Sequence, residues 1–312
     1  MKKIAFLFPG QGSQAVGMGL DFYQEFDFVR EIFEMTDEIA GANISRLCFK
    51  GPLEDLTQTV NLQPAMTAVN LASLAAVENE GISPNVSAGH SLGEYSALCA
   101  AGITSREDTL RLVIKRGELM HREATRHQGA MHALVGLSME KVQRLVLKVQ
   151  AEGPVSVANH NTELQIVITG APGPVEKVSA LAKEQGAKSI PLRVSGAWHS
   201  ELMKGAEADF RDFLKTIPFH PPAGAVVHNV SADTASEPDE IRAIMAKQLC
   251  SPVRWYDSMR KLEAVGVTVF AEIGPGRVLT GLLKKILPPD FPGQILNVND
   301  LKTFETFLKA LN

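Results

Sequence analysis

The 312-residue sequence is poor in cysteine and has no long uninterrupted apolar run. Its three cysteines, Cys48, Cys99 and Cys250, are widely spaced and match neither a metal-ligand nor a redox spacing, so no metal site is expected. No apolar stretch is long enough to cross a bilayer, and the start of the chain lacks the cleavage region of a signal peptide. We therefore expect a cytoplasmic protein that does not bind membranes.

The sequence also lacks an excess of positive charge, since 31 Lys and Arg residues face 35 Asp and Glu residues. The resulting net charge of −4 argues against nucleic-acid binding, which usually requires a basic surface. Hydrophobic residues make up 45% of the chain and charged residues 21%, as in ordinary globular proteins. The length allows one large domain, or a large domain with a smaller insertion.

Strand-like and helix-like apolar patterns alternate along both ends of the chain, which predicts an α/β fold. Before residue 126 we expect strands at residues 2–8 and 86–88 and helices at residues 21–40, 65–79, 92–100 and from Ser105 onward. After residue 197 we expect strands at residues 225–229 and 267–272 and helices at residues 200–216, 238–249, 255–264 and 277–286. Residues 1–125 and 198–312 are thus predicted to form one large α/β hydrolase-like domain with a parallel sheet at its core.

The middle of the chain follows a different pattern. Its predicted strands lie at residues 131–137, 155–159, 165–169 and 188–194, and its predicted helices at residues 138–150 and 174–184. The order β-α-β-β-α-β is that of a ferredoxin-like unit. We therefore predict that residues 126–197 form a small ferredoxin-like subdomain inserted into the large domain.

Ser91 is the predicted nucleophile. The segment Gly89-His90-Ser91-Leu92-Gly93 matches the pattern G-x-S-x-G and lies between a predicted strand and a predicted helix. Such a sharp turn exposes the serine hydroxyl and needs small residues on either side. The helix after it directs free N–H groups toward a developing oxyanion. A glycine-rich turn with an incidental serine is the alternative interpretation.

A serine nucleophile needs a base, and His199 is the candidate among the eight histidines. It follows the last predicted strand of the insertion and precedes the predicted helix at residues 200–216. A helix N-terminus disfavours the imidazolium ion, which would keep the ring neutral and basic. No nearby carboxylate presents itself as an orienting group, but a backbone carbonyl can also accept from Nδ1–H. A capping or packing histidine is the alternative.

Arg116 lies on the apolar face of the helix that begins near Ser105. Its neighbours three and four positions away are all apolar, namely Leu112, Val113, Leu119 and Met120. A guanidinium ion among apolar side chains requires an anion or other acceptors, and its planar fork suits a carboxylate. Two interpretations follow, a site for a substrate carboxylate or a structural salt bridge in the core.

The segment Gly10-Gln11-Gly12-Ser13-Gln14-Ala15 fits the dinucleotide-binding pattern G-x-G-x-x-A after a strand. That motif also needs a second strand ending in an acidic residue about 20 positions later. Residues 21–40 are helical in pattern, so a dinucleotide site is not expected. A tight glycine turn close to a nucleophile can instead supply a backbone N–H, and Gln11 is the candidate for a second oxyanion donor.

These segments together resemble the malonyl-CoA:acyl carrier protein transacylases, over nearly the whole chain. Several motifs occur in the order expected for that family: Phe8-Pro9-Gly10-Gln11-Gly12-Ser13-Gln14, Gln63-Pro64-Ala65, Gly89-His90-Ser91-Leu92-Gly93-Glu94, Arg116-Gly117, Gly129-Ala130-Met131, Val157-Ala158-Asn159 and Ile273-Gly274-Pro275-Gly276. The ferredoxin-like insertion also fits the architecture of that family.

The resemblance implies a two-step transfer of malonyl from malonyl-CoA to the phosphopantetheine thiol of an acyl carrier protein, supplying fatty acid synthesis without a bound cofactor. The roles it implies are a nucleophile and a base, two oxyanion N–H donors, a carboxylate-binding residue, a carbonyl that orients the base, and an acyl pocket. The corresponding residues are Ser91 and His199, Gln11 and Leu92, Arg116, Gln248, and Trp198, Met120 and Asn159.

The sequence departs from this family at two positions. Trp198 replaces a residue that is often phenylalanine, and its larger ring is expected to favour malonyl over methylmalonyl. His132 replaces a residue that is usually small, without a predicted consequence. The acidic carrier protein implies a local basic patch, for which Lys284 and Lys285 are candidates, although an ordinary solvated helix face explains them equally well.

Three alternatives to a transferase of fatty acid synthesis remain at this stage. The same chemistry could serve a polyketide synthase or a malonate decarboxylase. A serine hydrolase would release the acyl group to water. A non-catalytic binding module would not acylate Ser91 at all.

Overall fold

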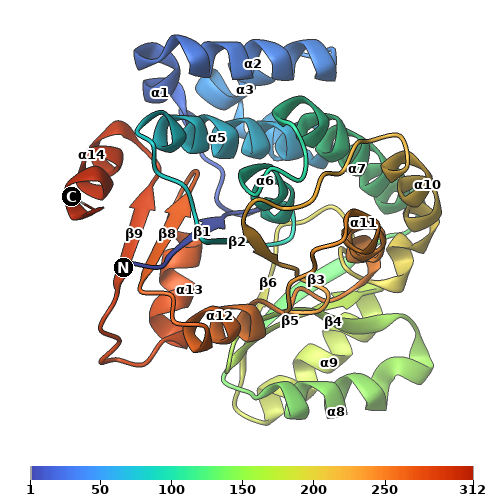
Figure 1. The fold of residues 1–312 in the computed structure, drawn as a ribbon. Coiled ribbons are helices and arrows are strands. Elements are labelled where there is room, and N and C mark those ends of the chain that lie inside the picture. The colour runs from blue at the N-terminus through green and yellow to red at the C-terminus, as the bar shows by residue number, and fades with distance from the viewer. Residues whose placement is uncertain (1, 312) are drawn as a thin grey trace.

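The computed structural model describes residues 2–311 and has one parallel and one antiparallel sheet within that range (Figure 1). The parallel sheet, called the large sheet, has five strands in the order β7-β2-β1-β8-β9. These strands are β1 (Ile4–Phe8), β2 (Val86–Gly89), β7 (Ala225–Val227), β8 (Val269–Ile273) and β9 (Gln294–Val298). The α/β class with a parallel sheet, predicted from the sequence, is thus confirmed.

Helices cover both faces of the large sheet, as parallel sheets require. On β1, Phe6 and Phe8 pack into the core below α2 (Asp27–Ala40), α5 (Thr59–Asn79) and α6 (Gly93–Ala100). Ala5 and Leu7 point the opposite way, toward α12 (Trp255–Ala264) and α13 (Val278–Ile286). Figure 1 shows these two groups of helices on opposite sides of the strands. The remaining helices of this part are α1 (Leu20–Glu25), α3 (Ile44–Lys50), α4 (Leu53–Thr57), α7 (Arg106–Arg126), α10 (Lys204–Leu214), α11 (Pro238–Lys247) and α14 (Leu301–Leu311).

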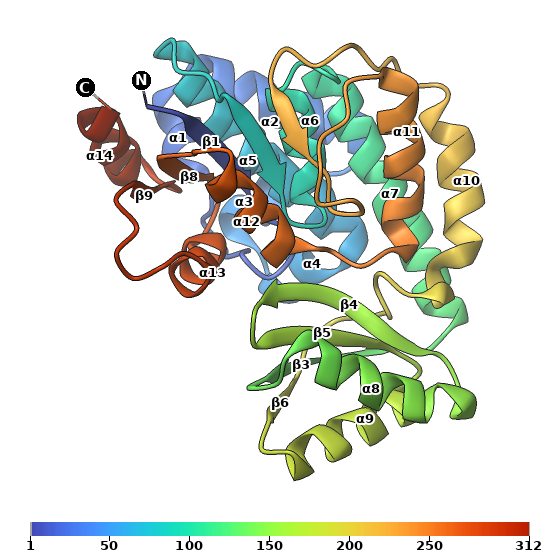
Figure 2. The ribbon, with the colours of Figure 1, turned by 60° about the horizontal axis from the view of Figure 1, so that its bottom comes forward.

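The antiparallel sheet, called the small sheet, has four strands in the order β4-β5-β3-β6. Its strands are β3 (Ala130–Val135), β4 (Val155–Thr162), β5 (Gln165–Gly170) and β6 (Lys188–Pro191). One face is covered by α8 (Met139–Val149) and α9 (Pro172–Glu184), which lie outermost in Figure 2. The other face packs against the main core through residues such as Met131 and Val167. The small sheet therefore has a face directed toward the large sheet.

A short backbone contact connects β4 to the part of the chain that holds the large sheet. The Val253 N–H donates to the Ala158 carbonyl at 2.8 Å, and the His160 N–H donates to the Val253 carbonyl at 2.9 Å. Val253 lies three residues after the end of the 3-10 turn Gln248–Cys250. The edge of the small sheet thus lies beside the segment that contacts His199.

Two segments that were each predicted as one helix are divided into two elements in the structure, so these predictions were wrong. Residues 21–40 form α1 and α2, because Phe26 is extended (φ −119°, ψ 124°) and its ring packs on Phe304 of α14. Residues 200–216 form a 3-10 turn, Glu201–Met203, followed by α10, which begins only at Lys204. In the first case distant packing breaks the helix, and in the second a serine side chain, Ser200, caps the 3-10 turn.

Other elements were misplaced or missed. α5 begins at Thr59 rather than residue 65 and contains Pro64, and β6 ends at Pro191 rather than residue 194. The elements α3, α4, β9 and α14 were not predicted. No helix within residues 2–311 is both long enough and apolar enough to span a membrane.

Candidate active site

Ser91 occupies the sharp turn between β2 and α6. Its φ of 51° lies in the left-handed region, which is costly for a residue with a side chain. The turn packs directly against the end of β1, because a Cβ atom added to Gly93 would lie 2.0 Å from the Phe8 carbonyl oxygen. Only glycine fits there, so the local sequence around Ser91 matches the strand–turn–helix geometry that the pattern predicts.

A frame of buried polar groups holds the backbone of Ser91. Its N–H donates to Asn229 Oδ1 at 2.7 Å, and its carbonyl accepts from Gln248 Nε2 at 2.9 Å. Asn229 Nδ2 also donates to the Gly89 carbonyl at 2.6 Å. Both sides of the strained residue are therefore tied to side chains from other elements.

Glu94 links the members of this frame. Its buried carboxylate is 2.9 Å from His228 Nδ1 and accepts from the Asn229 N–H at 3.2 Å and from Gln248 Nε2 at 2.6 Å. His228 and Asn229 were not predicted from the sequence. The available signal was their position, because they directly follow β7, whose carboxyl end lies beside that of β2.

His199 contacts the Ser91 hydroxyl, with 2.7 Å between Nε2 and Oγ. Its Nδ1 lies 3.0 Å from the carbonyl oxygens of both Gln248 and Ser251. Carbonyl oxygens only accept, so Nδ1 carries the ring proton and Nε2 is left to accept the serine proton. The structure thus brings His199 and the Gln248 carbonyl to the nucleophile, as the resemblance implied.

The His199 ring is buried, and its φ of 60° is also left-handed. Burial, together with the positive charge of Arg116, lowers its pKa from 6.5 to about 3. The predicted cause was a helix N-terminus, and that was wrong, because α10 begins five residues later, at Lys204. The outcome is nevertheless a neutral imidazole at neutral pH.

Arg116 is completely buried, on α7, beside the nucleophile. Its Nη2 donates to Ser91 Oγ at 3.2 Å, its Nη1 donates to Gln63 Oε1 at 2.9 Å, and its Nε has no acceptor. The guanidinium carbon lies 5.5 Å from the centre of the Tyr95 ring. No Asp or Glu within residues 2–311 forms an ion pair with Arg116, so the alternative of a structural salt bridge finds no partner in this part of the chain.

Two backbone donors face the same turn. In the described part of the chain, neither the Gln11 N–H nor the Leu92 N–H has a hydrogen-bond acceptor. The loop that carries Gln11 touches the nucleophile turn, since a Cβ on Gly10 would lie 2.4 Å from the His90 carbonyl oxygen and 3.5 Å from the Leu92 nitrogen. Two free donors close to a serine hydroxyl can bind an oxyanion.

A cavity of about 870 Å³ opens beside these residues. The residues that line it include Gln11, His90, Asn159 and Trp198, and also Val278 and Leu282 of α13. Trp198 is buried, with a relative exposure of 5%. The cavity is large enough for a long, thin substrate arm, and its lining includes His90, the residue next to Ser91.

Met120, which was predicted for the acyl pocket, and His132, which had no predicted role, lie away from this cavity. Met120 does not line it, and its sulfur instead lies 3.3 Å from Gln63 Nε2. His132 faces the helices of the small sheet, with Nδ1 2.7 Å from Ser179 Oγ on α9. Its neighbour Ala133 lines the cavity, as expected for alternating residues of a strand. His132 therefore does not contact an acyl group bound at Ser91.

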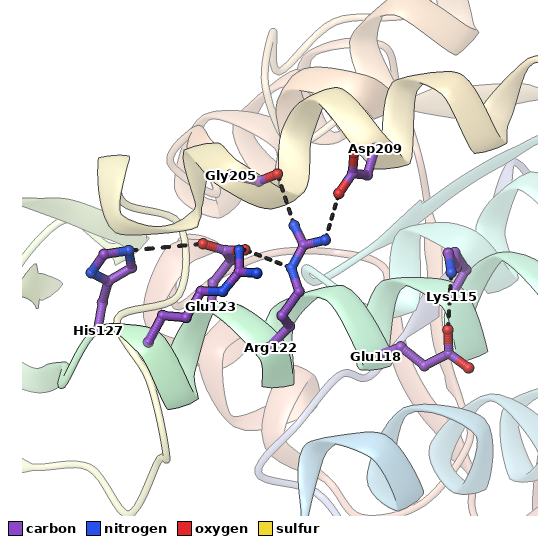
Figure 3. A network of polar contacts seen from close by, with 8 residues as sticks. Lys115, Glu118, Arg122, Glu123, His127, Gly205 and Asp209 are labelled. Carbon is purple, nitrogen blue, oxygen red and sulfur yellow. Dashed lines mark hydrogen bonds and ion pairs between the residues drawn. The ribbon is translucent and has the colours of Figure 1, made fainter.

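Polar contacts connect the far end of α7 to α10, as Figure 3 shows. Arg122 donates to the Gly205 carbonyl at 2.9 Å and to Asp209 at 2.5 Å. The buried carboxylate of Glu123 accepts from Arg122 Nε at 2.8 Å and from Arg126 at 3.2 Å. The helix that carries Arg116 is thereby joined to the segment that follows His199.

The helix α13 carries two positive charges close to the cavity. Lys284 and Lys285 are exposed on the last turn of α13, whose earlier residues line the cavity. Within residues 2–311 no three or more His, Cys, Asp or Glu side chains cluster in a way that could hold a metal ion. The arrangement is that of a serine with a neutral histidine base, two oxyanion donors and a buried cation, which can transfer or hydrolyse a carboxylated acyl group.

The chain is similar to known proteins over most of its length. Residues 5–294 match the family model of the acyl transferase domain. The chain is 45% identical to the malonyl CoA-acyl carrier protein transacylase of Bacillus subtilis (strain 168), over 100% of this chain and 98% of that protein. It is 41% identical to the polyketide biosynthesis malonyl CoA-acyl carrier protein transacylase PksC of the same organism, over 91% of this chain and 96% of that protein.

A solved structure is similar over its whole length. It is a malonyl-transacylase of a type II polyketide synthase in complex with its acyl carrier protein. The two chains superpose with a TM-score of 0.94 at 37% identity, covering 99% of each.

Proposed function

Because the chain belongs to the malonyl-CoA:acyl carrier protein transacylases, an acyltransferase family, we propose that it carries malonyl as an ester on Ser91. The enzyme uses malonyl-CoA as the donor and the phosphopantetheine thiol of an acyl carrier protein as the acceptor. The proposal assigns the two half-reactions to the residues gathered around that hydroxyl.

In the first half-reaction, His199 Nε2 takes the proton of Ser91 Oγ while the oxygen attacks the thioester carbonyl. The 2.7 Å separation between these atoms supports this transfer. The N–H groups of Gln11 and Leu92 bind the tetrahedral oxyanion, each contributing about 3 kcal/mol in the transition state. The carbon–sulfur bond then breaks, and the coenzyme A sulfur receives the proton from His199.

In the second half-reaction, His199 takes the proton of the carrier thiol, and the sulfur attacks the malonyl ester. Collapse of the second tetrahedral intermediate releases Ser91 Oγ, which recovers its proton from His199. The carbonyls of Gln248 and Ser251 keep the ring in the required tautomer throughout.

One observation carries the preference for malonyl, namely the buried guanidinium of Arg116, 3.2 Å from Ser91 Oγ and without an anionic partner in residues 2–311. The malonyl carboxylate supplies that partner. Anchoring it fixes the ester so that a bound thiol is aligned for attack and a random water is not, which favours transfer over hydrolysis. Trp198 narrows the cavity beside His199 and favours malonyl over methylmalonyl.

The proposal includes the organisation of the chain. Residues 126–197 form a ferredoxin-like subdomain inserted into an α/β hydrolase-like domain made of residues 1–125 and 198–312. The element order β3-α8-β4-β5-α9-β6 and the strand order β4-β5-β3-β6 support this division. The cavity then lies between the two parts, where enzymes often bind substrates.

The carrier protein is proposed to dock near Lys284 and Lys285, at the end of a helix that lines the cavity. We place the enzyme in the cytoplasm and in fatty acid synthesis. A polyketide synthase or a malonate decarboxylase would use the same chemistry, and transfer rates to the carrier protein of each pathway distinguish the three.

The test is an intact-mass measurement of the protein after incubation with malonyl-CoA, beside a Ser91→Ala variant. We expect one malonyl group on the parent chain only, and its loss when phosphopantetheinylated acyl carrier protein is added. Steady release of free malonate would instead indicate a hydrolase. Absence of any adduct, with malonyl-CoA intact, would indicate another donor or a binding role.

A further inference from the structure

We propose that Gln63 is a positioning residue that makes Arg116 selective for a carboxylated acyl chain, because its amide aims the guanidinium at Ser91 without neutralising it. This inference rests on the proposed function, in which Arg116 binds the malonyl carboxylate. Gln63 is completely buried on α5 and does not line the cavity. It therefore acts through Arg116 and not on the acyl group.

The orientation of the Gln63 amide follows from the chemistry of its neighbours. An arginine only donates, so the amide oxygen must face Arg116, and Oε1 accepts from Nη1 at 2.9 Å. The amide nitrogen then needs acceptors, which it finds in Thr59 Oγ1 at 3.2 Å and Met120 Sδ at 3.3 Å. Each side of the amide is satisfied, so the side chain is locked in one orientation.

The backbone brings α5 and α7 together at this point. A Cβ on Gly117 would lie 3.1 Å from the Thr59 carbonyl oxygen and 3.6 Å from Gln63 Cβ. Gly117 thus allows the first turns of α5 to approach the residue next to Arg116. This approach brings together two motifs that are far apart in the sequence, Gln63-Pro64-Ala65 and Arg116-Gly117.

A neutral partner is what this position requires. The guanidinium has to be held in place, since its position beside Ser91 decides which acyl group is anchored. A carboxylate at position 63 would hold it more tightly but would also pair with its charge and compete with the malonyl carboxylate. An amide occupies one Nη group and leaves the positive charge and the remaining donors for the substrate.

The same helical turn reaches the oxyanion loop. Thr59 Oγ1, which accepts from Gln63, is also 3.4 Å from Gln11 Nε2. The chain of contacts therefore runs from Arg116 through Gln63 and Thr59 to the side chain of Gln11. A substitution at Gln63 is expected to affect carboxylate recognition first, because Arg116 is its direct partner.

The test compares kcat/KM for malonyl-CoA and acetyl-CoA in full-length variants, since acetyl lacks the carboxylate. Gln63→Glu should lower the malonyl-to-acetyl ratio about 100-fold, mainly through a higher KM for malonyl-CoA. Gln63→Met, which keeps the shape but removes the amide, should lower the ratio about tenfold. Asn61→Asp makes the same amide-to-carboxylate change two residues away, outside the cavity lining, and should leave the ratio unchanged.

Arg116→Ala separates the two levels of the proposal. If Arg116→Ala lowers the ratio and folded Gln63→Glu and Gln63→Met variants keep the parental one, the inference about Gln63 is wrong. Equal losses for both substrates would also overturn it, because they would indicate a purely structural role. If Arg116→Ala itself leaves the ratio unchanged, the proposed role of Arg116 fails instead. Thermal melting establishes which variants are folded. If Gln63→Glu is not folded, the malonyl-to-acetyl ratio of Gln63→Met alone decides the inference.

Discussion

Ser91 and His199 both have left-handed backbone conformations, although neither is a glycine. Each such residue costs about 1–3 kcal/mol and persists only where its surroundings impose it. Here Asn229 and Gln248 hold the backbone of Ser91, and the carbonyls of Gln248 and Ser251 hold the ring of His199. Gln248 contributes to both, so the proposed nucleophile and base are positioned by a common neighbour.

Replacing Asn229 by Ala tests this frame at the level of one residue. The change removes the acceptor for the Ser91 N–H and the donor to the Gly89 carbonyl. We expect the free energy of unfolding to fall by about 2 kcal/mol and the rate of Ser91 acylation to fall at least about tenfold. Denaturant unfolding and the mass of the malonyl adduct over time measure the two effects.

Asn43→Ala is the matched control, because Asn43 caps α3 through its side chain, in a helix that contributes no residue to the frame. It should cost about 1 kcal/mol of stability and leave acylation unchanged. An Asn229→Ala variant that is destabilised but acylates at the parental rate would show that the frame does not position Ser91.

The depressed pKa of His199 predicts a specific dependence of stability on pH. Between pH 6.5 and pH 3 the unfolded chain binds a proton at this residue that the folded chain does not bind. The free energy of unfolding should therefore fall as the pH is lowered through that window, by about 2–3 kcal/mol from pH 6.5 to pH 4.5 for this group. A His199→Gln variant lacks the group and should lose stability less steeply. If parent and variant lose the same free energy of unfolding between pH 6.5 and pH 4.5, that result would contradict a pKa of about 3 for His199.

At the scale of elements, α7 connects two parts of the site. It carries Arg116 in its middle and, two turns later, Arg122, which donates to the start of α10 and to Glu123 (Figure 3). We expect Arg122→Met to lower the free energy of unfolding by about 1–2 kcal/mol, because it removes the hydrogen bond to the Gly205 carbonyl and the contact with Asp209. The preference for malonyl over acetyl should not change, since Arg116 keeps its own partners.

Lys115→Met on the same helix provides the control. Lys115 pairs with Glu118 at 3.2 Å, and both side chains are exposed. Its removal should change stability by no more than about 0.5 kcal/mol. Equal effects of the two substitutions in urea unfolding would mean that the contacts between α7 and α10 add no more than an exposed ion pair.

The elements that the sequence predicted are those with a strong local pattern. The residues 255–264 of α12 and the strand and turn before Ser91 were correctly located, because periodicity and glycine spacing are local signals. The break at Phe26 was not predictable in the same way, since it depends on packing against Phe304 in the last helix. The short helices α3 and α4 have seven and five residues, too few for a clear period.

The residues of the site also differ in whether a local sequence pattern predicted them. Ser91, His199 and Arg116 each carried a local signal, a glycine-flanked turn, a position after a strand, or a charge on an apolar face. The contacts of Asn229, Glu94 and Gln63 join segments far apart in the chain, and no local pattern indicates such contacts. The Gln248 carbonyl was expected only from family resemblance, because a backbone group leaves no mark on the sequence.

At the scale of the whole molecule, the cavity is lined by strands of the small sheet and by loops and helices that surround the large sheet. His90, next to the nucleophile, lies 2.8 Å through Nε2 from Asn161 Oδ1 on β4, and Val253 joins β4 to the segment that contacts His199. The relative position of the two sheets is thus coupled to Ser91 on one side and to His199 on the other. A substrate arm that enters the cavity meets residues from both parts.

A carrier protein cannot enter this cavity and must dock at its outer edge. Substitution of Lys284 and Lys285 on α13 tests whether positive charge there binds the carrier protein. The double substitution Lys284→Glu and Lys285→Glu should raise the KM for phosphopantetheinylated acyl carrier protein about tenfold or more, because it replaces attraction to an acidic partner by repulsion. Acylation of Ser91 at saturating malonyl-CoA should be unaffected, since the reacting groups are untouched. Intact mass reports the first half-reaction, and the rate of discharge to the carrier protein reports the second.

The pair Lys141→Glu and Lys148→Glu changes the net charge equally, but on α8, which covers the outer face of the small sheet (Figure 2). Raising the salt concentration should reduce the difference between the α13 variant and the parent chain, because screening weakens both attraction and repulsion between exposed charges. If the α8 variant slows discharge as much as the α13 variant, overall charge governs the encounter. Only a defect confined to the α13 variant assigns the docking of the carrier protein to the surface beside the cavity.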